Sequence, residues 1–81
     1  MNIIRKIRTT KYAKDLKGIG IPKGTTLYVI KEGPNALFGE HHKLLVVRID
    51  NGIGHLDLMP ETVIRDTDVS FKEIKNNNVE S

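Results

Sequence analysis

The sequence has 81 residues, a formal net charge of +3, and neither cysteine nor tryptophan. A chain this short forms one domain with a modest core, and without cysteine it has no disulfide framework, thiolate metal site or cysteine nucleophile. No apolar run approaches the roughly 20 residues of a membrane helix, and the first residues lack the apolar stretch of a signal peptide. We therefore expect a soluble, unexported protein of a reducing cytoplasm, with no membrane contact.

Charge is distributed unevenly along the chain. Residues 1–31 hold eight Lys and Arg against the single acid Asp15, whereas residues 32–81 hold five basic residues against nine acids. The net charge therefore conceals a basic first part and an acidic second part. A barrel that lays its first strand against its last would neutralise some of this asymmetry.

Short segments between Gly, Pro and Asn residues are typical of an all-β domain. In the first part, residues 6–13 predict a strand and residues 15–20 a short loop. Pro22 and Gly24 then predict a turn, because Pro fixes φ and Gly closes the turn. Residues 25–32 are rich in β-branched and aromatic residues and predict a second strand, with Leu27 and Val29 on one face.

The segment from Leu44 to Met59 predicts a hairpin around Asn51 and Gly52. Asn-Gly between two apolar runs favours a two-residue type I′ turn. This register pairs residues 45, 47 and 49 with residues 58, 56 and 54, and it makes one face of the hairpin apolar. It also sets Leu44 opposite Met59.

The remaining segments are short. Residues 33–43 predict a long connection that contains Leu37 and Phe38, and residues 59–62 a turn or one 3₁₀ turn before a last strand at residues 63–65. We expect the barrel to occupy residues 1–66, and residues 67–81 to form a C-terminal appendage and a flexible tail. The expected fold is an all-β barrel of about five short antiparallel strands.

This order of elements resembles an SH3 domain over about residues 6–65. The resemblance rests on Pro22-Lys23-Gly24-Thr25 before a strand, on the tight hairpin at Asn51-Gly52, and on Met59-Pro60-Glu61-Thr62-Val63 after it. It implies an SH3-like barrel of bacterial or phage type. The aromatic residues with which SH3 domains grip polyproline ligands do not carry over, since Lys43 and Leu44 stand in the tryptophan region. Small barrels of this kind have many unrelated partners.

Few residues suggest chemistry. His55 and Asp57 lie two apart in the expected hairpin but lack a nucleophile, so we expect no catalytic residue. His41 and His42 are adjacent and point different ways in an extended chain, so we expect no metal ion. The segment Gly18-Ile19-Gly20 leads into a strand rather than a helix, which argues against a phosphate loop. We expect no cofactor.

Two kinds of side chain suggest binding. The apolar candidates outnumber what the interior takes, and they predict a contact with a protein partner or a second copy through Tyr28, Leu37, Phe38, Leu44, Val46 and Met59. Cations in the first part suggest nucleic-acid or anion binding through Arg5, Arg8, Lys11, Lys14, Lys17 and Lys23. The first hypothesis is a non-enzymatic module for protein contact. The alternative is nucleic-acid binding, and a small enzyme or metal-binding protein comes third.

Overall fold

The structure is a computed structural model that describes residues 2–34 and 43–74. This part of the chain contains seven strands and two 3₁₀ turns, and no longer helix. In chain order they are β1 (Arg5–Thr9), β2 (Ala13–Lys14), β3 (Gly20–Ile21), β4 (Thr26–Pro34), β5 (Lys43–Ile49), η2 (Leu56–Leu58), β6 (Glu61–Arg65), η3 (Asp66–Asp68) and β7 (Phe71–Glu73). The expected all-β class is confirmed.

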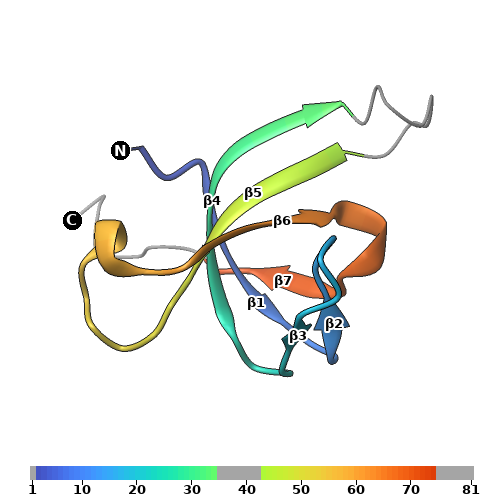
Figure 1. The fold of residues 1–81 in the computed structure, drawn as a ribbon, viewed down its shortest axis with the longest axis horizontal. Helices are drawn as coiled ribbons and strands as arrows, with labels where there is room; N and C mark the ends of the chain where they lie inside the picture. Colours follow the sequence, from blue (N-terminus) through green and yellow to red (C-terminus); the bar gives the residue numbers. More distant parts are fainter. Residues whose placement is uncertain (1, 35–42, 75–81) are drawn as a thin grey trace.

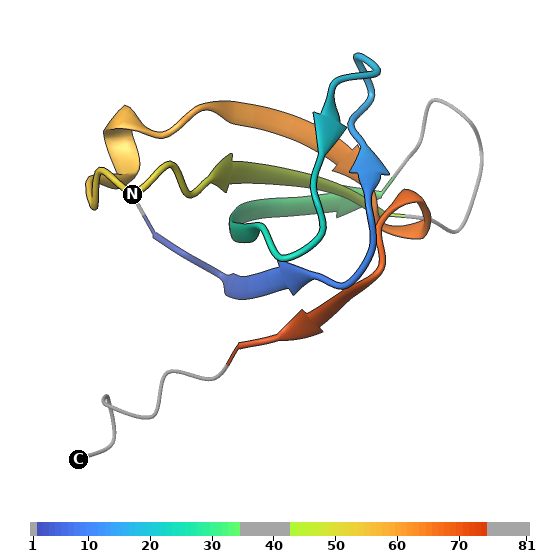
Figure 2. The same ribbon diagram turned by 90° about the horizontal axis from the view of Figure 1, so that it is seen from below.

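Five of the strands form one antiparallel sheet in the order β6-β5-β4-β1-β7, and β2 and β3 form a separate hairpin. The sheet is strongly curved, and the hairpin stands at one end of the molecule (Figure 1). The N-terminus and the connection between β5 and β6 lie at the other end in both views (Figure 2). The molecule therefore has two ends that are built from different loops.

The core lies on the concave side of the sheet. Alternate residues of each long strand point there, and the fully buried apolar side chains are Ile7, Leu27, Val29, Leu45, Val47 and Ile64. Ala13 and Ile21 of the hairpin complete the cluster from one end, with Val69. Complete burial of an aliphatic side chain of this size contributes roughly 1.5–3 kcal/mol.

The expected strand over residues 25–32 is observed as β4, and Leu27 and Val29 share the core face as expected. The turn before it also forms, with Gly24 at a φ of 84°. The first strand is shorter than expected and ends at Thr9. The Thr9 hydroxyl there donates to the Pro22 carbonyl at 2.7 Å and accepts from the Thr25 amide at 3.0 Å.

One irregularity changes which residues of β4 face the core. The pairing of β4 with β5 shifts between Val29 and Lys31, so that Ile30 is an extra residue on β4. After this bulge Glu32, rather than Lys31, is opposite the buried Leu45. A carboxylate is thereby brought to the concave side at the far end of the strand.

The predicted hairpin at Asn51 and Gly52 is wrong. β5 pairs with β6 instead, with Val47 opposite Thr62 and Leu44 opposite Arg65. A type I′ turn needs positive φ at both central residues, yet no non-glycine residue of the described chain has positive φ. The local side chains cap the backbone here: Asp50 accepts from the Gly52 amide and Asn51 from the Ile53 amide.

The sheet also continues beyond residue 66, where we expected an appendage. Residues 71–73 form β7 and pair with β1, with Arg8 opposite Lys72 and Thr9 opposite Phe71. Phe71 packs against the core cluster and Val69 belongs to it. These two apolar residues explain why the chain returns to the sheet after η3.

The observed register makes a stability prediction. Ile64→Ala should lower the free energy of unfolding by about 2–5 kcal/mol, because it opens a cavity beside Leu45. Leu58→Ala should change it by less than about 0.5 kcal/mol, since Leu58 is 62% exposed. Urea unfolding measures both. Equal losses from the two variants would contradict this register, because the Asn-Gly hairpin would place Leu58 in the core.

Candidate functional site

The β2–β3 hairpin is fixed to the sheet by Asp15, the residue that follows β2. Its Oδ2 accepts a 2.6 Å hydrogen bond from the Thr62 hydroxyl on β6, in a buried position. Its Oδ1 accepts from the backbone amides of Lys17 and Ile19 at 2.9 and 2.8 Å. The Leu16 amide also donates to the Val63 carbonyl at 3.0 Å. The loop is therefore held in shape and attached to the edge of the sheet at once.

These contacts favour the ionised form of Asp15. The hydrogen bond from Thr62 lowers the pKa of the Asp15 carboxyl below its ordinary value. Burial opposes this shift, and the amides of Ile19 and Lys17 and the charge of Lys17 lower the pKa further. The only acid of residues 1–31 thus serves the internal structure of the hairpin.

The outer surface of the hairpin is apolar and basic. Its exposed apolar side chains are Tyr12, Leu16 and Ile19, and its exposed cations are Lys11, Lys14 and Lys17. A shallow groove runs between the hairpin and η3, lined by Tyr12, Ala13, Lys14, Asp15, Leu16, Gly18 and Asp68. The hairpin therefore carries three of the expected nucleic-acid candidates, and one of them, Lys14, lines the same groove as the exposed Tyr12 ring.

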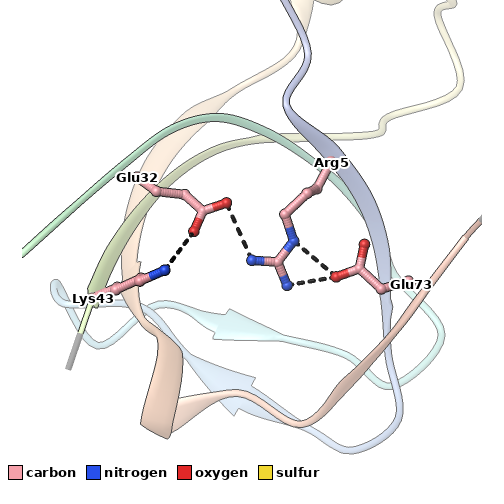
Figure 3. A network of polar contacts seen from close by, with 4 residues as sticks. All are labelled: Arg5, Glu32, Lys43 and Glu73. Carbon is pink, nitrogen blue, oxygen red and sulfur yellow. Dashed lines mark hydrogen bonds and ion pairs between the residues drawn. The ribbon is translucent and has the colours of Figure 1, made fainter. Parts of the chain in front are cut away.

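Arg5 belongs to a different environment from the other basic candidates. It lies on the concave side and joins Glu73 of β7 (Nε to Oε2, 2.8 Å) and Glu32 of β4 (Nη1 to Oε2, 3.1 Å), as Figure 3 shows. Lys43 approaches the other oxygen of Glu32 at 3.8 Å. The hydrogen bond to Glu73 raises the pKa of Arg5 most, against the lowering effect of burial. This network covers the core where the concave side opens to solvent.

The other two basic candidates are exposed. Lys23 lies in the turn before β4, and Arg8 projects from the convex face of β1. Arg8 is opposite Lys72 across the β1–β7 pair. Neither Arg8 nor Lys23 forms an ion pair with an acid of the described chain.

The apolar candidates are placed at several sites. Tyr28 is half-buried on β4, and Met59 is buried at 5% exposure. Both line a second groove at the N-terminal end, together with Ile3, Asp50, Gly52, Gly54 and Leu56. The Tyr28 hydroxyl points to Asp50 at 3.4 Å; burial, and then the charge of Asp50, raises the pKa of Tyr28.

Leu44 and Val46 do not join this groove. Both are half-buried on β5, opposite Arg65 and Val63. The expected contact of Leu44 with Met59 depended on the wrong hairpin register and is not formed. Leu37 and Phe38 lie outside the described residues, so the expected patch has only Tyr28 and Met59 together.

The sequence hypotheses about His residues remain without structural support. His55 and Asp57 are both exposed. The expected register set His55 opposite Arg48, but Glu61 of β6 occupies that position. His41 and His42 lie outside the described residues. Within residues 2–34 and 43–74 no group of three or more His, Asp or Glu side chains is arranged to hold a metal ion.

Several exposed apolar residues were not predicted from the sequence as binding candidates. Ile53 and Leu58 are exposed in the connection between β5 and β6, although the expected register made Leu58 a core residue. Tyr12 and Ile19 were read only as strand and loop residues. The signal for the hairpin was available in Asp15, because a lone acid followed by Gly18 and Gly20 is typical of a loop closed by side-chain to amide hydrogen bonds.

Comparisons of the chain with protein-family models, with curated proteins and with solved structures find no match. A search of the described residues for a helix of the length and apolarity that membrane crossing requires finds none.

The role of Asp15 predicts a pH dependence. Asp15→Asn should lower the free energy of unfolding at pH 7 by about 1–3 kcal/mol, because it removes a charged acceptor of three hydrogen bonds. Folding lowers the pKa from an ordinary 3.8, so the stabilisation is present above that pH and is lost as pH falls through the folded pKa. The difference between wild type and variant should therefore narrow below about pH 4.

Urea unfolding between pH 7 and pH 2 measures this difference. Asp57→Asn is the matched control, since it removes an exposed carboxylate that makes no hydrogen bond in the described chain. A stability gap for Asp15→Asn that stays constant over this pH range would contradict the assignment.

Proposed function

We propose that the chain is an SH3-like barrel that works as a small non-enzymatic binding module through protein contact. The strand order supports the barrel, because β7, the last strand, pairs with β1 and so joins the end of the described chain to its beginning within one curved sheet. The hydrogen bonds from Leu16 and to Asp15 bring the hairpin against the outer edge of β6. That contact favours a closed shape over an open sheet.

The internal polar contacts support a binding rather than a catalytic role. Asp15 is occupied by Thr62 and two amides, and Arg5 by two glutamates. Arg48 donates to the Met59 carbonyl at 2.9 Å and pairs with Glu61 at 3.1 Å. These ionisable groups hold loops and strands together, which is a structural use of their charge. The cysteine-free sequence is in keeping with the cytoplasmic location that we propose.

The observation that carries the proposal is the apolar end of the molecule. Four of the exposed large apolar side chains of the described chain belong to the two segments that form this end, the residues before β1 and the connection between β5 and β6: Ile3, Ile4, Ile53 and Leu58. The chain neighbours of Ile53 and Leu58, namely Gly52, Gly54 and Met59, line the second groove together with Ile3. A concentration of exposed apolar side chains is typical of surfaces that contact proteins.

A second copy of the chain is the partner that this end fits best. Exposed aliphatic side chains and a groove lined by Ile3, Tyr28, Leu56 and Met59 are both found at this end of the molecule. In a two-fold symmetric contact each copy offers the same surface, so that surface must contain both the inserting side chains and the groove that receives them. The apolar end meets this condition, with Ile53 and Leu58 as the side chains that would insert.

We therefore expect the wild-type chain to dimerise with a dissociation constant below the millimolar range, and Leu58→Asp to be monomeric. A charge at an exposed apolar contact loses the burial and leaves an unpaired carboxylate in the interface, which weakens association at least tenfold. Sedimentation equilibrium measures the association. Melting curves should show that Leu58→Asp folds as well as wild type, since the side chain is exposed in the monomer.

Ile19→Asp is the matched control. It places the same charge at an aliphatic residue of similar exposure, 58%, at the opposite end of the molecule, and it should dimerise as wild type does. A wild-type chain that remains monomeric at millimolar concentration contradicts the proposal, as does equal weakening by both substitutions.

A further inference from the structure

The hydroxyl end of the Tyr12 side chain lies against Gly20 of β3. A Cβ built on Gly20 would come within 2.8 and 2.9 Å of the ring atoms Cζ and Cε1, and closer still to the hydroxyl oxygen, so the ring occupies the space of a missing side chain. Tyr12 is nevertheless 62% exposed. The hydroxyl end of the side chain is therefore packed against Gly20, and much of the ring stays open to a ligand.

The hairpin that carries this ring also carries exposed cations, and no acid of the described chain pairs with them. Lys11, Lys14 and Lys17 are exposed and form no ion pair in the described chain, and the only acid of the hairpin, Asp15, is buried and accepts three hydrogen bonds. Asp68, which also borders the groove, lies 3.7 Å from Arg65. The groove beside Tyr12 therefore keeps an excess of positive charge.

The neighbouring strands extend this charge. Arg8 of β1 and Lys72 of β7 are directly opposite each other, and both are exposed. Like charges in this position destabilise a strand pair, so the arrangement gives no benefit to folding. It does suit a polyanion, which would bring negative charge between them. Lys23, in the turn that is bonded to Thr9, adds a further cation near the end of β1.

We infer that the hairpin surface binds single-stranded nucleic acid, with a base stacked on Tyr12 and phosphates held by Lys11, Lys14 and Lys17. An exposed aromatic ring among flexible cations is the combination that single-strand binding uses, since the ring accepts any base and the cations follow the backbone. In a duplex the bases are stacked on one another and do not reach the ring. Asp15 fixes the loop before the ligand arrives, which reduces the entropy cost of binding.

The direct test is fluorescence anisotropy of a labelled oligothymidylate of about 15 nucleotides, titrated with the full chain from 50 to 200 mM salt. Affinity should fall with salt by about 0.7 logarithmic units per logarithmic unit of salt for each phosphate contacted. Replacing Lys11, Lys14 and Lys17 together by Ala should reduce that slope by about 2. Absence of binding at 50 mM salt overturns the inference.

Lys31→Ala and Lys14→Ala form a matched pair. Lys31 is an equally exposed lysine on β4, away from the hairpin, so Lys31→Ala changes the net charge alone. We expect Lys14→Ala to weaken binding several-fold and to lower the salt slope, and Lys31→Ala to do neither. Equal effects of the two variants would show attraction by net charge only and would overturn the site.

Substitutions at the ring separate stacking from charge. Tyr12→Ala should weaken binding about tenfold without changing the salt slope, and Tyr12→Phe should bind as wild type does. Gly20→Ala should weaken binding similarly, because the new methyl group displaces the end of the Tyr12 side chain and leaves every lysine in place. Wild-type affinity of Tyr12→Ala would overturn the role of the ring.

Two competitors distinguish the ligand class. Polyglutamate at the same charge concentration, and a duplex of the same length, should both compete more weakly than the single strand. Stronger competition by polyglutamate would reassign the hairpin to an acidic protein, and stronger competition by the duplex would exclude the stacked base. Leu58→Asp, at the other end of the molecule, should bind the oligonucleotide as monomeric wild type does, so this inference is tested independently of dimerisation.

Discussion

The architecture depends on one buried carboxylate more than on any other polar group. Asp15 accepts hydrogen bonds from its own loop and from Thr62, a residue 47 positions later in the sequence. Without this contact, among the hydrogen bonds of the described chain, that of the Leu16 amide to Val63 would be the one left between the hairpin and β6. Burying a charge is costly unless it is well hydrogen-bonded, and here three donors offset that cost. The shape of the hairpin surface, including the spacing of Tyr12 and the lysines, follows from the same contact.

A second constraint operates at the open side of the sheet. The bulge after Val29 turns Glu32 toward the core side, where Arg5 and Lys43 meet it. Arg5 also lies over the Phe71 ring, 5.2 Å from its centre, so the guanidinium covers apolar surface while its charge is balanced by two glutamates. Partly exposed ion pairs contribute little stability individually. Together, however, they connect four strands, β1, β4, β5 and β7, on the concave side of the sheet.

The sequence predicted those elements whose signals are local. The strand predicted at residues 25–32, observed as β4, follows from its β-branched residues, and the predicted turn forms with Gly24 at positive φ. The prediction of the strand that pairs with β5 was wrong because two segments, residues 53–58 and residues 61–65, both alternate apolar and polar side chains in a way that could pair with β5. The turn signal at Asn51 and Gly52 favoured the nearer one. The choice was made by Asp50 and Asn51, which bond to amides two residues ahead, and by Ile64, which fills the core opposite Leu45.

The ion pairs of the basic residues show why the candidate sites could not be predicted from the distribution of charge along the sequence. The acids of residues 32–34 and 43–74 pair with particular cations: Glu32 with Arg5 and Lys43, Glu73 with Arg5, Glu61 with Arg48, and Asp68 with Arg65. The lysines of the hairpin form no ion pair with an acid of the described chain, and β7 likewise brings Lys72, not an acid, opposite Arg8. A count along the chain treats Arg5 and Lys14 alike. Their difference arises from strand pairing, which sets one inside an ion-pair network and the other beside an exposed ring.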